Sequence, residues 1–217
     1  NVLDIGCGWG SFAKYAAEKY GVDVVGITVS KEQIALGQKL TEGLPVELRL
    51  QDYRDLSGSF DRVVSLGMFE HVGYKNYGVF IDVVQRVLVD DGLFLLHTIG
   101  RNWSSHSNDP WIDRYIFPNS MLPSIEQIGA SIGQRFVMED WHNFGMDYDK
   151  TLQAWYTNFE RGWSEIEKNY GERFHRMWRF YLLSSAATFR SRRNQLWQIV
   201  LSKSRKQEYR RENFAPS

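Results

Sequence analysis

The first ten residues constrain the fold of this chain more than any other segment. A mostly apolar run, 1–5, is followed by Gly6, Gly8 and Gly10, and a helical pattern begins at Ser11. This pattern predicts a strand that turns sharply into a helix, where glycines let a ligand approach the backbone and the helix N-terminus offers unpaired N–H groups. A dinucleotide site would need glycine at position 11. The G-x-G-x-G spacing therefore favours a site for S-adenosylmethionine (SAM), with a turn that binds nothing as the alternative.

The following pattern predicts an α/β fold. Strands are expected at 1–5, 22–27, 46–51, 60–66 and 92–98, and helices at 11–20, 31–42 and 76–89. Such alternation is typical of a doubly wound, mostly parallel Rossmann-like sheet, here expected to have seven strands. A helix from Ser124, a strand at 136–141, a helical stretch at 147–190 and a last strand at 196–201 are expected to follow. We therefore treat 1–217 as one domain, in which 101–125 is a lid loop and 147–190 a helical, aromatic stretch.

Composition excludes several classes of protein. The 26 basic and 26 acidic side chains give no overall attraction to nucleic acid, and no apolar run is long enough to cross a bilayer. The single cysteine cannot form an internal disulfide and fits a reducing cytosol, and no Cys or His pair has zinc-site spacing, so no metal is expected. Aromatic residues make up 15% of the chain, which suits either a generous core or an apolar cavity lined with rings.

The polar tail and the start of the chain carry separate expectations. The tail from Ser202 is interpreted as a solvated terminus, with attraction to a membrane surface as the alternative. Its basic residues are Lys203, Arg205, Lys206, Arg210 and Arg211. The first residue is Asn1, which already belongs to a strand pattern, so we expect a segment upstream of it.

Ligands of such sheets bind at the carboxyl ends of the strands, so the strand ends are compared with one another. The candidates for SAM binding are Asp4, Gly6, Cys7, Gly8 and Gly10 after the first strand, Thr28, Ser30 and Gln33 after the second, and Asp52 and Tyr53 after the third. Thr28 and Gln33 stand where many related folds place an acid for the ribose hydroxyls. Asp52 and Tyr53 suit the adenine, although Asp52 could equally cap a helix or turn. Cys7 is interpreted as a small packed side chain, not a nucleophile.

The fourth and fifth strands end in candidates for acid–base chemistry. Glu70 and His71 follow the fourth strand, and His97 lies at the end of the fifth. A carboxyl and an imidazole near a reacting methyl group could transfer a proton. Spacing leaves the structural alternative open for each: Glu70 as a paired structural acid, His97 as a satisfied buried histidine, and His71 as a structural side chain.

Several motifs together resemble the cyclopropane-fatty-acyl-phospholipid synthases over essentially the whole chain. They are Leu3–Gly10, Gly67–Gly73, Leu95–Gly100, Ile116–Asn119, Leu122–Ser124, Trp141–Gly145 and Tyr148. The segments Gln51–Leu56 and Met138–Phe144 resemble the bacterial phospholipid enzymes more than the mycolic acid cyclopropane synthases. The resemblance implies a class I SAM-dependent methyltransferase fold, in which 1–217 is one catalytic domain and 147–190 a helical, lipid-facing insertion before the last strand.

The resemblance also implies a reaction and its machinery. The methyl group of SAM is added to a cis double bond of an unsaturated phospholipid acyl chain, and the carbocation closes to a cyclopropane after a base removes a proton. That base is a bound bicarbonate, for which the implied ligands are Glu70, His97, Tyr148 and the backbone of Ile99, with Gly67 in the same catalytic set. Aromatic walls would stabilise the cation without trapping it.

The resemblance further implies contact with unsaturated phospholipids at the inner membrane surface, a cytoplasmic location, no nucleic-acid partner, and a homodimer of the full-length parent. The family's bicarbonate-binding cysteine, further SAM contacts and an N-terminal lipid-binding domain lie ahead of Asn1. We therefore expect the chain alone to bind SAM weakly and to cyclopropanate poorly. Ser184-Ser185 stands where the family often carries a cysteine in the late helix, and no loss is expected from that change.

Two rival functions remain open from sequence. One is a SAM-dependent methyltransferase that acts on a lipid or small molecule without ring closure. The other is a truncated, non-catalytic module that binds SAM or lipid.

Overall fold

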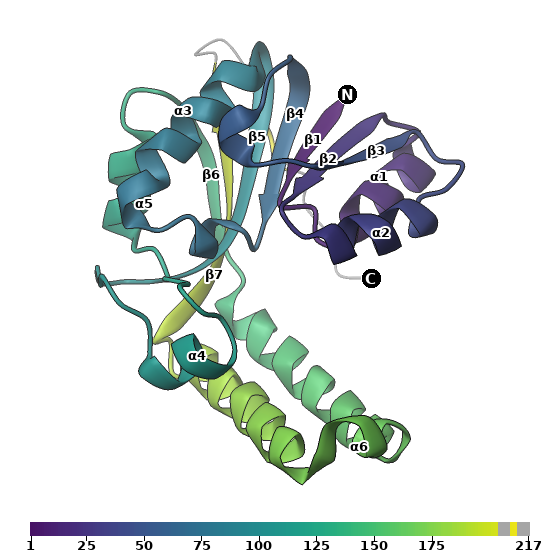
Figure 1. Ribbon diagram of the computed structural model, residues 1–217. Coiled ribbons are helices and arrows are strands. Elements are labelled where there is room, and N and C mark those ends of the chain that lie inside the picture. Colours follow the sequence, from purple (N-terminus) through teal and green to yellow (C-terminus); the bar gives the residue numbers. More distant parts are fainter. Residues whose placement is uncertain (204–208, 212–217) are drawn as a thin grey trace.

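The structure is a computed structural model that describes residues 1–203 and 209–211. Its centre is a seven-stranded sheet in the order β3-β2-β1-β4-β5-β7-β6 (Figure 1). The strands are β1 (Val2–Ile5), β2 (Val24–Thr28), β3 (Val46–Leu50), β4 (Phe60–Leu66), β5 (Leu88–Arg101), β6 (Val137–Asn143) and β7 (Asn194–Ser202). Neighbours among β1–β5 are parallel, whereas β7 runs antiparallel to both β5 and β6. The predicted fold class is confirmed.

The helices occupy three regions around this sheet. They are α1 (Ser11–Tyr20), α2 (Lys31–Leu40), α3 (Tyr77–Val87), α4 (Pro110–Tyr115), α5 (Ile125–Ile132) and α6 (Gly145–Arg190). Figure 1 shows α1 and α2 beside β1–β3, α3 and α5 together at the other half of the sheet, and α6 extending away from it. No described helix is long and apolar enough to cross a membrane.

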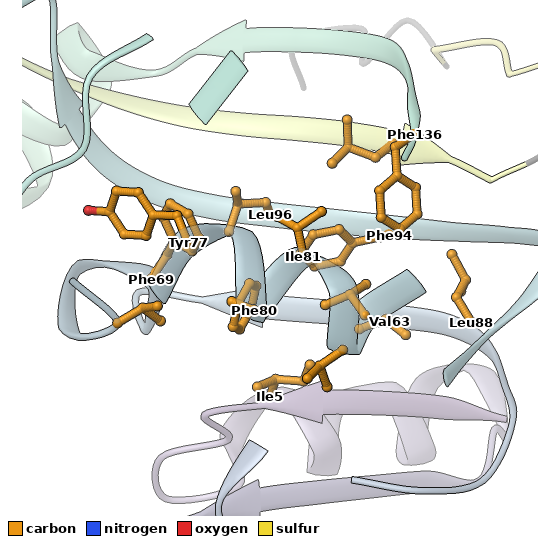
Figure 2. Packing of buried hydrophobic residues seen from close by; sticks show 14 of the residues in the cluster. Ile5, Val63, Phe69, Tyr77, Phe80, Ile81, Leu88, Phe94, Leu96 and Phe136 are labelled. Atoms are coloured by element: carbon orange, nitrogen blue, oxygen red, sulfur yellow. The ribbon is translucent and has the colours of Figure 1, made fainter. Parts of the chain in front are cut away.

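The main core lies between the sheet and the pair α3 and α5. The apolar stripe of α3 is buried, as its 3.6-residue period predicts, and it meets β1, β4 and β5 (Figure 2). Phe69 stacks on Tyr77 with ring centroids 4.2 Å apart, so the loop after β4 is anchored to the start of α3. This packing fixes the position of Glu70, the next residue after Phe69.

The structure differs from the expected elements at the start of β5 and adds a short helix within 101–125. β5 begins at Leu88, directly after α3, instead of at residue 92. Leu88 pairs with Phe60 of β4, and the register shifts before Arg62, so the segment 88–91 belongs to the strand and not to the helix or the connection after it. Within 101–125 the structure also forms α4, where Asp109 caps the backbone N–H groups of Trp111 and Ile112 and Pro110 begins the helix.

The helical insertion is a hairpin. α6 covers Gly145–Arg190 and is interrupted at Gly171, where φ is 68° and ψ is 168°. Arg190 Nε donates to the buried Asp149 carboxylate at 2.9 Å, so the last turn is tied to the first. Leu152, Leu182 and Phe189 form a separate apolar cluster with Leu196 of β7. The insertion is thus attached to β7, the strand next to the edge strand β6.

The polar tail differs in part from a freely solvated terminus. Lys203 Nζ donates to the Leu88 carbonyl at 2.9 Å and lies 3.0 Å from Asp90, and Arg211 forms an ion pair with Asp140. Arg205 and Lys206 lie outside the described residues. These contacts hold the end of β7 against β5 and β6.

Candidate active site

The glycine turn after β1 has the predicted geometry. Gly6, Gly8 and Gly10 have φ values of 83°, 55° and 80°, the left-handed region that favours glycine. The N–H groups of Gly6 and Cys7 both donate to the Ile27 carbonyl, at 3.0 and 2.9 Å, which joins the turn to the end of β2. A Cβ on Gly8 would meet no atom within 4 Å, so its backbone faces open space where a ligand can approach.

Asp4 lies beneath this turn and is only 1% exposed. Neither of its carboxylate oxygens has a hydrogen-bond partner among the described residues, and burial raises the pKa of this carboxyl to about 7. Cys7 is buried beside Gly26, and burial, followed by the nearby Asp4 charge, raises the pKa of its thiol to about 12. A thiol with that pKa is protonated at neutral pH, which agrees with a packing role.

The candidates after β2 and β3 lie in two adjacent turns. Thr28 Oγ1 donates to Gln33 Oε1 at 2.6 Å, while the Ser30 hydroxyl accepts from the Gln33 N–H and caps α2. Asp52 caps a short 3-10 turn and forms a bidentate ion pair with Arg54. Asp52 therefore caps this turn, which was the alternative to a SAM-binding role. Binding of the adenine by Asp52 stays a prediction. Tyr53 packs against Phe80 of α3.

Glu70 is the most constrained ionisable group of the site. Its Oε1 accepts the Ile99 N–H at 2.7 Å, and its own carbonyl accepts the Met121 N–H at 2.8 Å. Oε2 is buried without a hydrogen-bond partner among the described residues, and the neighbouring Thr98 hydroxyl donates to the Ile99 carbonyl. Burial raises the pKa of Glu70 to about 7 despite the Ile99 hydrogen bond. The carboxyl thus holds a proton readily near neutral pH.

A cavity of about 870 Å³ opens beside Glu70, between the carboxyl ends of β4 and β5, the segment 101–125 and α6. Gly67, Ile99 and Tyr148 also line it, so four of the five predicted catalytic residues come together there. Burial, followed by the Glu70 charge, raises the pKa of Tyr148. The aromatic wall consists of Trp103, Trp111, Phe117, Phe180, Tyr181 and Phe189. The volume and the apolar lining suit a hydrocarbon chain.

His97 is the exception among the five. Its backbone carbonyl accepts the Gly67 N–H at 2.9 Å, but its imidazole Nδ1 lies 3.3 Å from Gln198 Nε2 and the residue does not line the cavity. Burial lowers the pKa of His97, so the ring is neutral at pH 7. His71 does line the cavity, with its ring 6.0 Å from that of Phe117. Its pKa is also lowered by burial.

Sequence reasoning missed several residues that line the cavity. Arg101, Trp103 and Arg193 meet there, although 92 residues separate the two arginines. Arg101 is opposite Asn194 in the β5–β7 ladder, and this pairing brings the two segments together. The only sequence signal was the aromatic composition, which predicts a ring-lined cavity without naming its members. Ser184 and Ser185 do line it, and the Ser184 hydroxyl donates to the Tyr181 carbonyl.

Comparison with known proteins identifies the family. The pattern described as mycolic acid cyclopropane synthetase matches residues 1–199. The chain belongs to this family. It is 57% identical over 202 residues to the cyclopropane-fatty-acyl-phospholipid synthase of Escherichia coli K12, which covers 93% of this chain and 53% of that protein. The chain therefore spans about half the length of the curated relatives it matches.

More distant relatives are also similar to this chain. A probable fatty acid methyltransferase of Pseudomonas putida is 39% identical, over 93% of this chain and 54% of that protein. Among solved structures, the cyclopropane synthase MmaA2 of Mycobacterium tuberculosis has a TM-score of 0.86 at 29% identity, over 93% of this chain and 77% of that one. The mycolic acid cyclopropane synthase CmaA1, complexed with SAH and CTAB, has a TM-score of 0.85 at 30% identity, over 93% of this chain and 77% of that one. The higher identity to the phospholipid enzyme confirms the predicted resemblance.

Proposed function

We propose that this chain is the SAM-binding and catalytic part of a synthase that converts cis double bonds of unsaturated phospholipid acyl chains into cyclopropanes. The observation that carries the proposal is the Glu70 carboxyl, buried at the wall of an aromatic cavity with one oxygen unpartnered. The identity to the E. coli synthase supports the same reaction class. The proposed location is the cytoplasm, in contact with the inner membrane surface, and the proposed state of the full-length protein is a homodimer.

The residues of the glycine turn fit SAM. SAM supplies an electrophilic methyl group on a sulfonium centre when bound. The open backbone at Gly8 admits a ligand, and the unpartnered Asp4 carboxylate suits a ligand that carries positive charge. Further candidates for the SAM site lie at the ends of the adjacent strands β2 and β3. They are Thr28 and Gln33, whose side chains are hydrogen-bonded to each other, and Asp52 and Tyr53. The structure of the related CmaA1 with SAH supports this assignment.

The cavity residues would stabilise the carbocation and hold the base that removes its proton. In the reaction, a double-bond carbon forms a bond to the methyl carbon of SAM as the bond from that carbon to sulfur breaks and S-adenosylhomocysteine leaves. The neighbouring carbon becomes cationic, and the ring closes as the new methyl group loses a proton to the base. Aromatic faces along the cavity stabilise positive charge without forming a bond to it. Bicarbonate, when bound, supplies the base. A protonated Glu70 can donate a hydrogen bond to that anion from Oε2, and the Tyr148 hydroxyl can donate another.

His97 remains a predicted ligand of the same anion. In this structure its Nδ1 lies 3.3 Å from Gln198 Nε2, and the residue does not line the cavity. We therefore assign the firmer roles to Glu70, Ile99 and Tyr148.

Mass spectrometry of lipids tests the proposal. The full-length protein carrying this chain is incubated with SAM, bicarbonate and vesicles of cis-unsaturated phosphatidylethanolamine. A gain of one CH₂ with loss of the double bond is expected. A gain of one CH₂ with the double bond retained would show methylation without ring closure, and unchanged lipid alongside measurable SAM binding would show a non-catalytic module. Either result contradicts the proposal.

A further inference from the structure

The cavity contains a pair of arginines that the proposed chemistry does not use. The guanidinium carbons of Arg101 and Arg193 lie 6.0 and 5.7 Å from the ring centroid of Trp103, and all three residues line the cavity. Arg101 ends β5, Trp103 follows it, and Arg193 precedes β7. An indole face attracts planar guanidinium groups, so Trp103 brings two cations to one part of the cavity wall.

These two positive charges have no counter-ion in the described part of the chain. No described carboxylate forms an ion pair with either guanidinium, and Arg101 Nε is buried without a hydrogen-bond partner. The nearby acids are committed elsewhere: Asp109 caps α4, and Glu126 accepts the Ser104 hydroxyl at 2.8 Å. Burial, followed by the charge of Arg193, lowers the pKa of Arg101. Arg193 is exposed, so an anion that contacts both groups would relieve the desolvation of Arg101 and the repulsion between the two charges.

The position of the arginine pair relative to Glu70 suits an anionic group that belongs to the same molecule as a hydrocarbon chain. Ile99, whose N–H fixes Glu70, is two residues before Arg101 on β5, about 7 Å along the strand. The arginine side chains extend beyond that point to Trp103, which is 45% exposed. An anionic group at the arginines and a hydrocarbon chain at Glu70 therefore fit one molecule in one cavity.

We propose that Arg101 and Arg193 bind the phosphodiester of a phospholipid whose acyl chain lies in the same cavity. The inference rests on the proposed function and adds a recognition site for the substrate's phosphate. Guanidinium groups match phosphate oxygens in bidentate geometry, and charge-assisted hydrogen bonds of this kind are the strong ones. The pair thus selects phosphate-bearing lipids over neutral ones with the same acyl chains.

The test compares two lipids with identical cis-unsaturated chains, a phosphatidylglycerol and a diacylglycerol, both dispersed in neutral detergent micelles. The full-length protein, the variant Arg101→Gln/Arg193→Gln and the control Arg179→Gln are assayed. Arg179 also lies over a ring, Tyr156, at 6.0 Å, but does not line the cavity. For the double variant we expect KM for phosphatidylglycerol to rise about tenfold or more, with kcat, SAM affinity and KM for diacylglycerol unchanged. The control is expected to match the wild type.

Three results would overturn the assignment. An unchanged KM for phosphatidylglycerol would show that the pair does not bind the substrate. An equal rise of KM for both lipids would show a packing role. In a third outcome, millimolar inorganic phosphate binds the wild-type protein and not the double variant, while the KM for phosphatidylglycerol stays the same in both. That result would show a site for free phosphate. Direct binding of both lipids without SAM separates this inference from the proposed function. A preference for phosphatidylglycerol that needs both arginines, without any lipid turnover, would support the inference and refute the function.

Discussion

Glu70 acquires its properties from the residues around it. Its sequence neighbours give a short 3-10 turn after β4, which includes Phe69. The Ile99 N–H, the Met121 N–H and the Tyr77 ring that stacks on Phe69 come from other elements. Together they exclude water from the carboxyl and leave one oxygen for a ligand. A carboxyl in such surroundings keeps its proton near neutral pH and can donate a hydrogen bond to an anion.

Replacing Glu70 by glutamine tests this role. Glu70→Gln keeps the shape and can still accept the Ile99 N–H, so we expect SAM affinity to be unchanged. Turnover should fall by roughly 10²-fold or more, the usual scale of a lost acid–base group. The amide can still donate a hydrogen bond, but it cannot exchange a proton with the bound anion as a carboxyl with a pKa of about 7 can, so the response to added bicarbonate should also weaken. Calorimetry with SAM and initial rates at several bicarbonate concentrations check this. A variant with wild-type turnover would leave Glu70 a structural acid.

A valine at Gly8 tests the SAM site. Gly8→Val adds a branched side chain in the space where the ligand is proposed to approach, so SAM affinity should fall at least tenfold, about 1.4 kcal/mol. Gly43→Val is the matched control, because Gly43 also has a positive φ, 79°, and open space around it, but lies in the turn before β3. Both variants pay a similar backbone cost, so equal losses of SAM affinity would argue against the site.

At the scale of elements, α6 shows two glycines with opposite roles. Gly162 is helical, whereas Gly171 adopts φ 68° and ψ 168°, a conformation essentially restricted to glycine. The reversal at Gly171 lets the second half of α6 return to the cavity, where Phe180, Tyr181 and Phe189 form part of the wall. Figure 1 shows α4 lying beside this returning half, and Trp111 of α4 meets Phe180 with ring centroids 4.7 Å apart.

Alanine at these two positions should have opposite effects on stability. Gly171→Ala should lower the free energy of unfolding by roughly 1–3 kcal/mol, because alanine is strained in that conformation. Gly162→Ala should raise it by about 0.5–1 kcal/mol, since the added methyl group has open space and alanine favours helix. Urea unfolding followed by circular dichroism measures both. Stabilisation by Gly171→Ala would mean that α6 does not reverse at that residue.

At the scale of the whole molecule, two buried carboxyls oppose stability at neutral pH. Burial raises the pKa of Asp4 from 3.8, and that of Glu70 from 4.5, to about 7 in each case. Between these limits the folded protein binds more protons than the unfolded chain. The free energy of unfolding therefore falls as pH rises through this window and levels off above pH 7.

The expected loss between pH 4.5 and 7.5 is of the order of 3 kcal/mol for each carboxyl. Asp4→Asn/Glu70→Gln should flatten most of this slope, since neither amide ionises. Urea unfolding at several pH values in the absence of SAM checks the prediction, with Asp147→Asn as an exposed control that should keep the wild-type slope. A flat profile for the wild-type protein would contradict the inferred pKa values.

The parallel half of the sheet follows directly from the sequence. Apolar strands alternate with amphipathic helices, and glycines at Gly6, Gly8 and Gly10 permit the turn that joins β1 to α1. These are local properties, because each depends on side-chain period or on backbone freedom within a few residues. The same holds for the capping box at Ser124 and for the SAM-site candidates at the strand ends.

The tertiary structure alone decided which residues share the cavity. The start of β5 at Leu88, the reversal at Gly171 and the meeting of Arg101 with Arg193 all depend on partners remote in sequence. The orientation of His97 toward Gln198 is likewise set across the β5–β7 ladder. The sequence by itself determined the fold class, the glycine turn and the identity of the chemical groups. Packing determined which of those groups lose water and which face one another, because desolvation and long-range pairing depend on the whole chain.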